Sequence, residues 1–413
     1  MNPLVLHSVY RYLPLTETWI YGQIQALSGF RQAVACVDRE APERFPFDDL
    51  ASLSDHGAAR GIEGLLRAIA RLRRQPDARF DRLLAPWYRH GWPMLERSKL
   101  RTWAPAVLHA HFGDQAVRTL GLARATGAPL VTTFYGYDLA LAREPFWRQS
   151  YQRLFREGER FLVEGSAMGR TLASLGCPPS KIHVQHLGIA LDAPPLSPRL
   201  FSPRLPASPC RVLIAASFRE KKGIPQALEA YARVLARHPE HLALTVIGDG
   251  PLREAIHAQA RALGLEGHVR WLGYQPHAVF LEEAHRAHLF LHPSITARDG
   301  DTEGGAPVSL LEAQATGLPV LSTQHADIPE ATTPESAVLV PERDVDALEA
   351  ALEALALHPE RWAAMGEAGR RHVARHYDAR KQGERLAAHY HAAIAAHGRA
   401  AQLKDGRGRG ARS

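Results

Sequence analysis

The stretch that decides the fold is Arg298-Asp-Gly-Asp-Thr-Glu-Gly-Gly-Ala-Pro-Val-Ser-Leu-Leu-Glu-Ala-Gln-Ala-Thr-Gly-Leu-Pro-Val320. It predicts an acidic, glycine-rich loop, then a helix, then a short apolar strand. Gly304 and Gly305 let the backbone approach a ligand, because glycine has no side chain in the way. Pro307 suits the first helical position, where its missing N–H is not needed. The free N–H groups of that helix end then form an anion site facing the loop.

Two carboxylates flank this predicted anion site. Glu303 precedes the turn and Glu312 lies within the helix. A carboxylate there can accept hydrogen bonds from sugar hydroxyls. An anion site beside such carboxylates suggests a sugar nucleotide. We therefore expect the donor-binding residues of this stretch to be Gly304, Gly305, Ala306, Pro307, Val308 and Glu312.

The chain as a whole has the composition of a globular α/β protein. Its 413 residues suggest two domains, and 46% apolar with 23% charged residues is ordinary for a folded protein. No apolar run reaches the roughly 18–20 residues that span a bilayer, and the start lacks signal-peptide features. The three scattered cysteines fit a reducing compartment, so we expect a cytoplasmic protein.

Short β-rich runs alternate with helical patterns along the chain, which is typical of parallel α/β sheets. The pattern runs through residues 1–192, stops in a proline-rich linker at 193–209 and restarts over 210–376. A helix is expected at 377–400 and a disordered basic tail at 401–413. We predict two doubly wound domains that face each other across a cleft at the carboxyl edges of their strands.

The formal net charge of +7 indicates an anionic partner. Between Arg60 and Arg101, arginines alternate with apolar residues at helical spacing, which predicts a basic amphipathic insert at 58–103. Such a helix can lie on an anionic membrane surface, or it can be a solvated helix that packs on its own domain. Nucleic acid is not favoured, because no nucleic-acid-binding module accompanies the basic stretch.

Two further turns in the second domain are candidates for phosphate binding. In Phe218–Gly223, Lys222 can reach a diphosphate as a point charge and Arg219 can bind it bidentately; a solvated charge run is the alternative. Gly248 and Gly250 allow close approach of a phosphate or base, although a tight turn explains them equally well.

Two strand ends in the first domain carry candidate acceptor-side residues. His109 and His111 are two apart and share one strand face, so one of them can reach the cleft. The rival interpretation is a metal-dependent hydrolase, but Asp114 is one residue out of step for a His-x-His-x-Asp ligand set. Tyr135 and Asp138 follow the next strand. We expect no metal site.

Taken together, these residues resemble the family-four retaining glycosyltransferases of GT-B fold, particularly those that build bacterial exopolysaccharides such as colanic acid. The resemblance covers nearly the whole chain. It is carried by Leu15–Ile20, Leu108–Gly113, Thr133–Asp138, Glu164–Ser166, Gly176–Pro178, His186–Gly188, Glu220–Gly223, Gly248–Leu252, Gly304–Pro319, Ser322–Glu330 and Met365–Arg370.

The resemblance implies a role for particular residues. By position, Lys222 holds the donor diphosphate and Glu312 the ribose, while Glu303 lies near the donor sugar. Arg219 substitutes for the arginine that the family carries nearby. His111 matches the family's histidine near the reacting centre. Tyr135 stands where many members have the histidine of Phe-His-Gly.

The hypothesis is a retaining glycosyltransferase that moves a sugar from a nucleoside diphosphate sugar onto a glycan acceptor, lipid-linked and at the inner face of the cell membrane. The candidate catalytic residues are His111, Lys222 and Glu303, and the acceptor-side residues are Trp19, His111, Tyr135 and Asp138. No cofactor is expected. Two alternatives stay open: a metal-dependent hydrolase built on His109 and His111, and a non-catalytic scaffold that binds sugar nucleotide.

Overall fold

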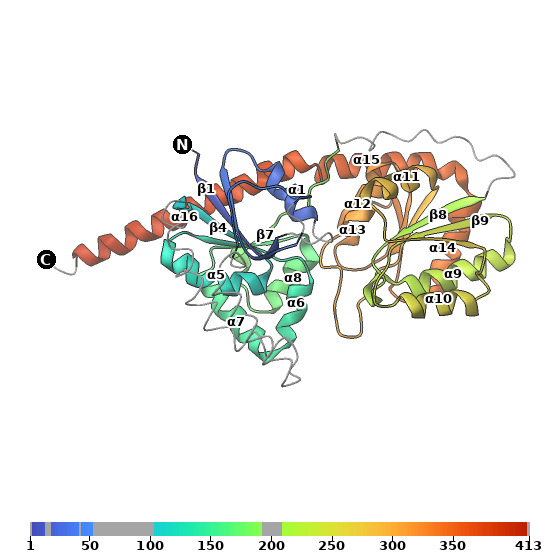
Figure 1. Ribbon diagram of the computed structural model, residues 1–413, viewed down its shortest axis with the longest axis horizontal. Coiled ribbons are helices and arrows are strands. Elements are labelled where there is room, and N and C mark those ends of the chain that lie inside the picture. Colours follow the sequence, from blue (N-terminus) through green and yellow to red (C-terminus); the bar gives the residue numbers. More distant parts are fainter. Residues whose placement is uncertain (1, 13–17, 41–42, 53–102, 192–208, 411–413) are drawn as a thin grey trace. The chain divides into compact units, whose positions relative to one another are not determined.

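The computed structural model describes residues 2–12, 18–40, 43–52, 103–191 and 209–410, with side chains up to residue 399. These residues form two compact units. The first consists of Met1–Glu164, Gly169–Gly188 and Arg380–Ser413, and the second of Gly165–Met168 and Ile189–Ala379. Each unit is built on one parallel sheet (Figure 1).

The first unit contains a sheet of strand order β3-β2-β1-β4-β5-β6-β7, with every pair parallel. Its strands are β1 Leu4–Tyr12, β2 Arg31–Arg39, β3 Leu50–Ser52, β4 Val107–His111, β5 Leu130–Thr133, β6 Arg160–Val163 and β7 Ile182–Val184. Its helices are α1 Thr18–Ala26, α5 Gly113–Thr126, α6 Tyr137–Ala140, α7 Pro145–Glu157, α8 Ser166–Ser174 and α16 Ala379–Gly410, with short 3₁₀ turns at Leu141–Arg143 and Pro179–Lys181.

One face of the first sheet is covered by the far end of the chain. Val5 and Val107 of adjacent strands pack against Leu386, Tyr390 and Ala393 of α16 in one apolar cluster. Burying side chains of this size contributes about 1.5–3 kcal/mol each, which binds α16 to the first unit. The sequence predicts C-terminal helices that cross back to the first domain, and α16 does so.

The second unit contains a sheet of order β10-β9-β8-β11-β12-β13, again parallel throughout. Its strands are β8 Cys210–Ala215, β9 Leu242–Ile247, β10 Val269–Gly273, β11 Leu289–His292, β12 Val320–Thr323 and β13 Ala337–Val340. Its helices are α9 Ile224–Arg237, α10 Arg253–Ala262, α11 His277–Arg286, α12 Val308–Ala315, α13 Ile328–Ala331, α14 Val345–Leu357 and α15 Trp362–His376, with 3₁₀ turns at Glu220–Lys222 and Pro359–Arg361.

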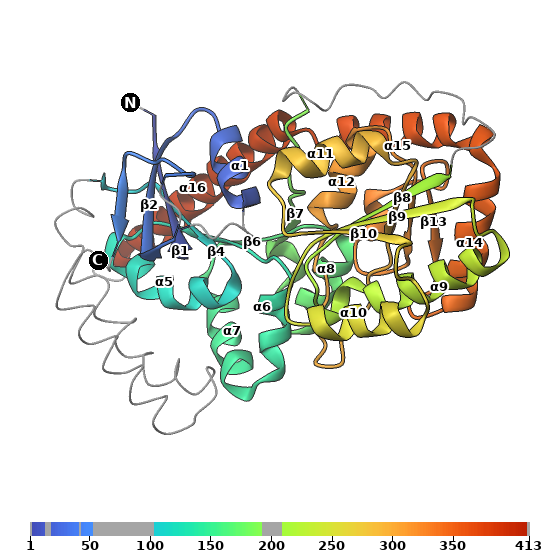
Figure 2. The ribbon, with the colours of Figure 1, turned by 45° about the vertical axis from the view of Figure 1, so that its right-hand side comes forward.

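Two apolar layers cover the second sheet, one on each face. The α9, α10 and α14 side chains pack on one face, where Tyr231 of α9 is fully buried. The α11 and α12 side chains pack on the other, where Phe280 and Leu310 are buried. Figure 2 shows α9 and α10 on the opposite side of the strands from α11 and α12. Both layers leave the carboxyl ends of the strands to the loops.

The sequence also predicts strands at Val107–His111, Leu289–His292 and Ala337–Val340 and a helix at Val345–Leu357, and the structure has all four with these limits. No strand was predicted at β3 and no helix at α11 or α13, because these segments carry no clear period. The predicted insert at 58–103 lies outside the described residues except Trp103, and so does the linker except residue 209.

The tail differs from its prediction. We expected residues 401–413 to be disordered, but α16 continues to Gly410. Once its first turns are packed against the sheet, each further residue adds a hydrogen bond without a new nucleation step. No helix among the described residues is both long enough and apolar enough to cross a membrane.

Candidate functional site

The turn that carries Lys222 is set by a glycine. After β8 the chain makes a 3₁₀ turn over Glu220–Lys222, and Gly223 has a left-handed φ of 61°. A Cβ on Gly223 would lie 1.8 Å from the carbonyl oxygen of Pro293, so no other residue fits without a shift of the backbone. The turn is therefore packed directly on the loop that follows β11.

The two glycines after β9 are explained by backbone packing. Gly248 and Gly250 have φ values of 146° and 158°. A Cβ on Gly248 would lie 1.9 Å from the carbonyl oxygen of Ala216, and one on Gly250 would lie 2.9 Å from the backbone nitrogen of Phe218. Their predicted contact with a donor stays a prediction, because the close approach of these two loops already requires glycine.

Lys222 and Glu303 form a buried ion pair. The Lys222 Nζ lies 2.7 Å from Glu303 Oε2, and the Glu303 side chain is only 4% exposed. Ser294 donates its hydroxyl to Glu303 Oε1 at 2.6 Å, and His292 Nε2 lies 3.3 Å from the same atom. Burial by itself raises the pKa of Glu303, but Lys222 and His292 outweigh it and hold that pKa well below its ordinary value.

A second layer of hydrogen bonds holds the loop between β11 and α12. His325 Nε2 accepts the backbone N–H of Glu303 at 3.1 Å, while His325 Nδ1 lies 2.7 Å from Glu342 Oε1. Lys221 donates to Asp301 Oδ1 and to the carbonyl oxygen of Thr302. Asp301 thus pairs with a lysine and belongs to the loop, as we expected for the Asp299–Asp301 segment.

The helix after the loop begins one residue later than predicted. Pro307 is its N-cap rather than its first residue, and the Pro307 carbonyl accepts the N–H groups of Leu310 and Leu311. Gly304 has a left-handed φ of 79°, which turns the loop into the helix. Gly304, Gly305 and Pro307 are buried, while Ala306 and Val308 are partly exposed. The predicted donor residues thus form one continuous loop and helix start.

Glu312 lies on the first turns of α12 with its carboxylate 15% exposed. His277, the first residue of α11, places Nε2 2.7 Å from Glu312 Oε1. The hydrogen bond to Glu312 raises the pKa of His277 above its ordinary value. Arg219, in contrast, has an exposed side chain that makes no hydrogen bond or ion pair with any described residue. It stands in the same turn as Lys222.

Three of the four predicted acceptor-side residues lie together in the first unit. His111 ends β4 and its Nδ1 lies 2.7 Å from the hydroxyl of Tyr135, which follows β5. The Trp19 ring of α1 lies 6.2 Å from the Tyr135 ring, centroid to centroid. His111 is fully buried and Tyr135 is 7% exposed. The pair therefore belongs to the packed end of the sheet.

The fourth residue, Asp138, ties two loops to each other. Its buried carboxylate accepts the backbone N–H groups of Gly113, Tyr135 and Gly136. Burial raises the pKa of Asp138 to about 7 in spite of these hydrogen bonds. Phe112, just before Gly113, has a φ of 75°, an unfavourable value that Asp138 helps to hold in place.

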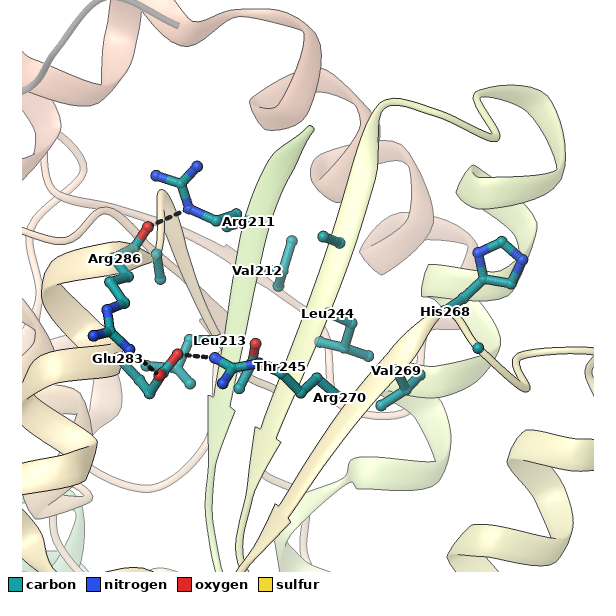
Figure 3. A pocket seen from close by; sticks show the side chains of 13 residues that line it. Arg211, Val212, Leu213, Leu244, Thr245, His268, Val269, Arg270, Glu283 and Arg286 are labelled. Atoms are coloured by element: carbon teal, nitrogen blue, oxygen red, sulfur yellow. Dashed lines mark hydrogen bonds and ion pairs between the residues drawn. The ribbon is translucent and has the colours of Figure 1, made fainter. Parts of the chain in front are cut away.

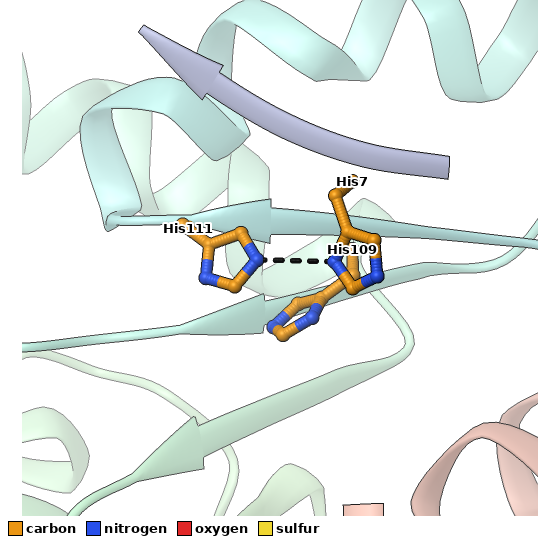
Figure 4. A group of neighbouring side chains, drawn as sticks. All are labelled: His7, His109 and His111. Atoms are coloured by element: carbon orange, nitrogen blue, oxygen red, sulfur yellow. Dashed lines mark hydrogen bonds between the residues drawn. The ribbon is translucent and has the colours of Figure 1, made fainter. Parts of the chain in front are cut away.

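Three histidines cluster at the adjoining strands β1 and β4 (Figure 4). The nitrogens of His7, His109 and His111 lie within 4.8 Å of one another, and all three rings are fully buried. His109 already has a partner at each nitrogen: Thr133 Oγ1 at 2.7 Å and the Tyr390 hydroxyl at 2.6 Å. A metal would have to displace one of these hydrogen bonds. His7 was not predicted as part of this group, because a lone histidine in a strand carries no spacing signal.

His292, Ser294, His325 and His277 were also missed. His325 lies in the Ser322–Glu330 stretch, but that stretch gave no indication of its partner, and each of the four residues reaches the predicted carboxylates only through the fold.

A separate cavity of about 670 Å³ lies at the opposite end of the second sheet (Figure 3). It is lined by the first residues of β8 and β10, among them Arg211 and Arg270. Glu283 pairs with both Arg270 and Arg286 in its wall. Because Lys222 and Glu303 follow the carboxyl ends of β8 and β11, this cavity is not the predicted donor site.

Two family models match this chain. Residues 201–372 match the family model described as Glycosyl transferases group 1, and residues 29–193 match Glycosyltransferase Family 4. The putative colanic acid biosynthesis glycosyltransferase WcaL of Salmonella typhimurium is 36% identical over 60% of this chain and 60% of its own length. The amylovoran biosynthesis glycosyltransferase AmsK of Erwinia amylovora is 33% identical over 63% of each chain. The chain thus spans about 60% of the length of these curated relatives.

Solved structures share the fold. HepE of Anabaena in complex with UDP and glucose superposes with a TM-score of 0.70 at 14% identity, over 94% of this chain and all of that one. Sucrose-phosphate synthase of Thermosynechococcus elongatus gives 0.70 at 15% identity, over 96% and 100%. The predicted GT-B architecture is confirmed. Neither family model is that of a hydrolase, so the metal-dependent hydrolase has no support.

Proposed function

Because the chain belongs to the group 1 and family 4 glycosyltransferases, we propose that it transfers a sugar from a nucleoside diphosphate sugar to a glycan acceptor in cell-surface polysaccharide synthesis. The acceptor class follows from the names of the relatives, which act in colanic acid and amylovoran biosynthesis. The donor class follows from the second unit and from HepE, which holds UDP and glucose.

The observation that carries this proposal is the Lys222–Glu303 pair at the start of α12. The Lys222 ammonium is held 2.7 Å from the buried Glu303 carboxylate and is presented there as a fixed positive charge. A diphosphate can replace the carboxylate as its partner, with the exposed Arg219 adding a bidentate contact. Glu312 is then placed to accept hydrogen bonds from the ribose hydroxyls.

In the reaction that we propose, the acceptor hydroxyl oxygen bonds to the anomeric carbon of the sugar as the bond to the diphosphate breaks. The hydroxyl proton passes to the departing phosphate on the same face, so the configuration is retained. Lys222, Arg219 and the N–H groups at the start of α12 stabilise the charge that develops on the diphosphate. Glu303, which pairs with Lys222, is the candidate residue of the second unit near the sugar. No metal is assigned to this step.

The test is binding of nucleotides measured by calorimetry. UDP, GDP and ADP are each compared with the corresponding monophosphate on the wild type, Lys222→Ala and Lys221→Ala. We expect Lys222→Ala to weaken the preferred diphosphate by about 10–100-fold, the worth of a hydrogen bond to a charged group. The monophosphate should change much less.

Lys221→Ala is the matched control, because Lys221 is held by Asp301 and Thr302 and has no assigned contact with the donor. If Lys222→Ala left diphosphate binding unchanged, or if both lysine variants weakened it equally, the assignment of the donor site would be wrong. The comparison of UDP, GDP and ADP also identifies the donor nucleotide. A separate assay, sugar transfer to a cell-envelope lipid extract, distinguishes an enzyme from a scaffold that only binds the nucleotide.

We further propose that the basic amphipathic segment between Arg60 and Arg101 attaches the protein to an anionic membrane surface, where a lipid-linked acceptor would be found. The support is its sequence alone: arginines interleaved with apolar residues at helical spacing. Cosedimentation with vesicles should require anionic lipid and weaken with salt. Vesicle binding that does not change with the salt concentration, or no binding at all, would refute the membrane assignment.

A further inference from the structure

One chain of hydrogen bonds runs through the first unit from Gln32 to Gln23. Gln32 Oε1 lies 3.1 Å from His7 Nε2, and His7 Nδ1 lies 3.1 Å from His111 Nε2. His111 Nδ1 lies 2.7 Å from the Tyr135 hydroxyl, which lies 3.2 Å from the Gln23 amide. The residues come from α1, β1, β2, β4 and the loop after β5. Every contact joins two side chains that can each donate or accept, so the distances alone do not say which of the two donates.

The direction is set at one end by a backbone carbonyl. Gln32 Nε2 donates to the carbonyl oxygen of Ile24 at 3.1 Å, and a carbonyl can only accept. Gln32 therefore turns its amide oxygen toward His7. Two acceptors cannot face each other at this distance without repulsion, so His7 carries a proton on Nε2.

The tautomer of His111 follows from that of His7. Burial lowers the pKa of His7 to about 4, so the ring is neutral near pH 7 and its Nδ1 is an acceptor. His111 must then donate from Nε2. Burial, together with the neighbouring His7, also lowers the pKa of His111, so that ring is neutral and its Nδ1 is an acceptor as well.

At the other end, Tyr135 has a single hydroxyl proton, which it donates in a hydrogen bond to His111 Nδ1. The Tyr135 oxygen is then left to accept from Gln23, which requires the Gln23 amide to present its nitrogen. Oxygen and nitrogen of an amide side chain are told apart only by their hydrogen bonds. The buried Gln23 nitrogen otherwise has no partner, so this orientation supplies the acceptor that it lacks.

We propose that His7 is a positioning residue for His111: it holds that ring as the neutral tautomer with the proton on Nε2, while Tyr135 fixes the opposite nitrogen. Both ring nitrogens of His111 are then committed, so the ring can neither flip nor take up a proton without breaking a buried hydrogen bond. This also gives a reason for tyrosine at position 135. Its hydroxyl can donate its one proton to His111 Nδ1 and still accept from the Gln23 amide, so one side chain serves both neighbours.

The functional consequence rests on the proposed glycosyl transfer. His111 is the candidate residue near the reacting centre, and its strand end leads directly into Phe112 and Gly113. A ring fixed at both nitrogens keeps that strand end in one arrangement through the reaction. Loss of His7 should therefore lower kcat and leave the affinity for the diphosphate, which is bound by the second unit, unchanged.

The rival interpretation of the same three histidines is a metal site (Figure 4). Only the facing nitrogens of His7 and His111 are available to a metal, since His109 is bonded at both nitrogens. Two ligands do not make the three-or-four-ligand sphere of a zinc site. The hydrogen bonds, in contrast, give a partner to each ring nitrogen: the chain does so for His7 and His111, and Thr133 and Tyr390 do so for His109.

The test is nitrogen NMR of the full-length protein labelled at histidine, with His111 assigned by His111→Gln. In the wild type we expect the neutral form of His111, protonated at Nε2, from pH 5.5 to 8. In His7→Phe, His111 should become a tautomer mixture or titrate. His7→Asn keeps an acceptor oxygen near the position of His7 Nδ1, so the wild-type tautomer of His111 should be largely restored. His109→Asn is the matched control and should leave the tautomer of His111 unchanged.

Three results would overturn the inference. They are an Nδ1-protonated His111 in the wild type, an unaltered His111 in folded His7→Phe, and stoichiometric zinc in the purified protein that is lost in His7→Phe. The wild-type spectrum decides even if the variants fail to fold. Transfer assays add the second readout: kcat should fall at least 10-fold in His7→Phe and recover in His7→Asn. If no donor is turned over by any form, the proposed function fails, while the NMR result still decides the tautomer.

Discussion

Replacing Lys222 by alanine should destabilise the second unit far more than replacing its neighbour. The variant removes the cation that lies 2.7 Å from Glu303, whose side chain is 4% exposed. Removing one partner of a buried pair costs about 3–5 kcal/mol, because the other charge is left without compensation. Glu303 keeps the hydroxyl of Ser294 and the ring of His292, which places the loss at the lower end, about 3 kcal/mol.

Lys221→Ala is the matched control. Lys221 pairs with Asp301, which is 23% exposed, so solvent replaces much of the interaction when the lysine is removed. A loss of about 1 kcal/mol is expected there. For a unit of 150–250 residues each kcal/mol corresponds to about 2–4 °C, so Lys222→Ala should lower the melting temperature by about 6–12 °C, against about 2–4 °C for Lys221→Ala.

Differential scanning calorimetry at several pH values makes the test sharper. In the wild type the pKa of Glu303 lies well below its ordinary 4.5, so its contribution to stability is present above pH 4.5 and is lost as the pH falls through the folded pKa. Without Lys222, burial dominates and the pKa of Glu303 rises. The carboxyl can then take up a proton. The difference in melting temperature between Lys222→Ala and the wild type should therefore become smaller as the pH falls from 7 to 4.5.

Two results would refute this reasoning about the ion pair. One is a fall in melting temperature in Lys222→Ala that is no larger than in Lys221→Ala. The other is a difference in melting temperature between Lys222→Ala and the wild type that stays constant or widens as the pH falls. The double variant Lys222→Met with Glu303→Gln provides an internal check. It removes both charges, so it should be more stable than Lys222→Ala at pH 7.

Two further predictions concern the donor site and its turn. Glu312→Gln should return the pKa of His277 toward its ordinary 6.5, because the hydrogen bond to Glu312 raises that pKa. An NMR titration of His277 measures the change, and an unchanged midpoint would contradict the contact. The small stabilisation from that pair is complete below pH 6.5 and is lost as the pH rises through the folded pKa. Gly223→Ala should cost more than about 2 kcal/mol in urea unfolding, since its Cβ would meet the carbonyl oxygen of Pro293, whereas Gly264→Ala, with φ +70° and open space, should cost about 1–2 kcal/mol. Equal losses would show that backbone conformation alone, without the close contact, sets the cost.

Much of the second unit could be predicted from the sequence because its signals are local. The apolar runs that form β11 and β13 are bounded by polar and turn residues, and their limits match the prediction. The spacing of Lys222, Glu303 and Glu312 around strand ends places them at one edge of a parallel sheet, since all carboxyl ends of such a sheet lie on the same side. That reasoning needs only periodicity and the direction of the chain.

The partners of those residues could not be predicted in this way. His292 and Ser294 reach Glu303 from the end of β11 and His325 from the end of β12, while His277 reaches Glu312 from a helix that has no clear period. The residues near each of them in the sequence do not indicate which carboxylate it contacts. Only the order of strands in the sheet brings them together.

The sequence by itself determined the class of fold, the two-unit organisation and the residue types available for binding a sugar nucleotide, because periodic burial and turn chemistry act between residues close in the chain. The tertiary structure alone decided which charge Lys222 faces, and that His7 stands beside His111 in register with His109. It also decided that Tyr390, from the far end of the chain, completes the bonding of His109. These contacts join residues up to 281 positions apart. Hydrogen-bond direction and ionisation depend on distances of about 3 Å, and such distances exist only after the chain has folded.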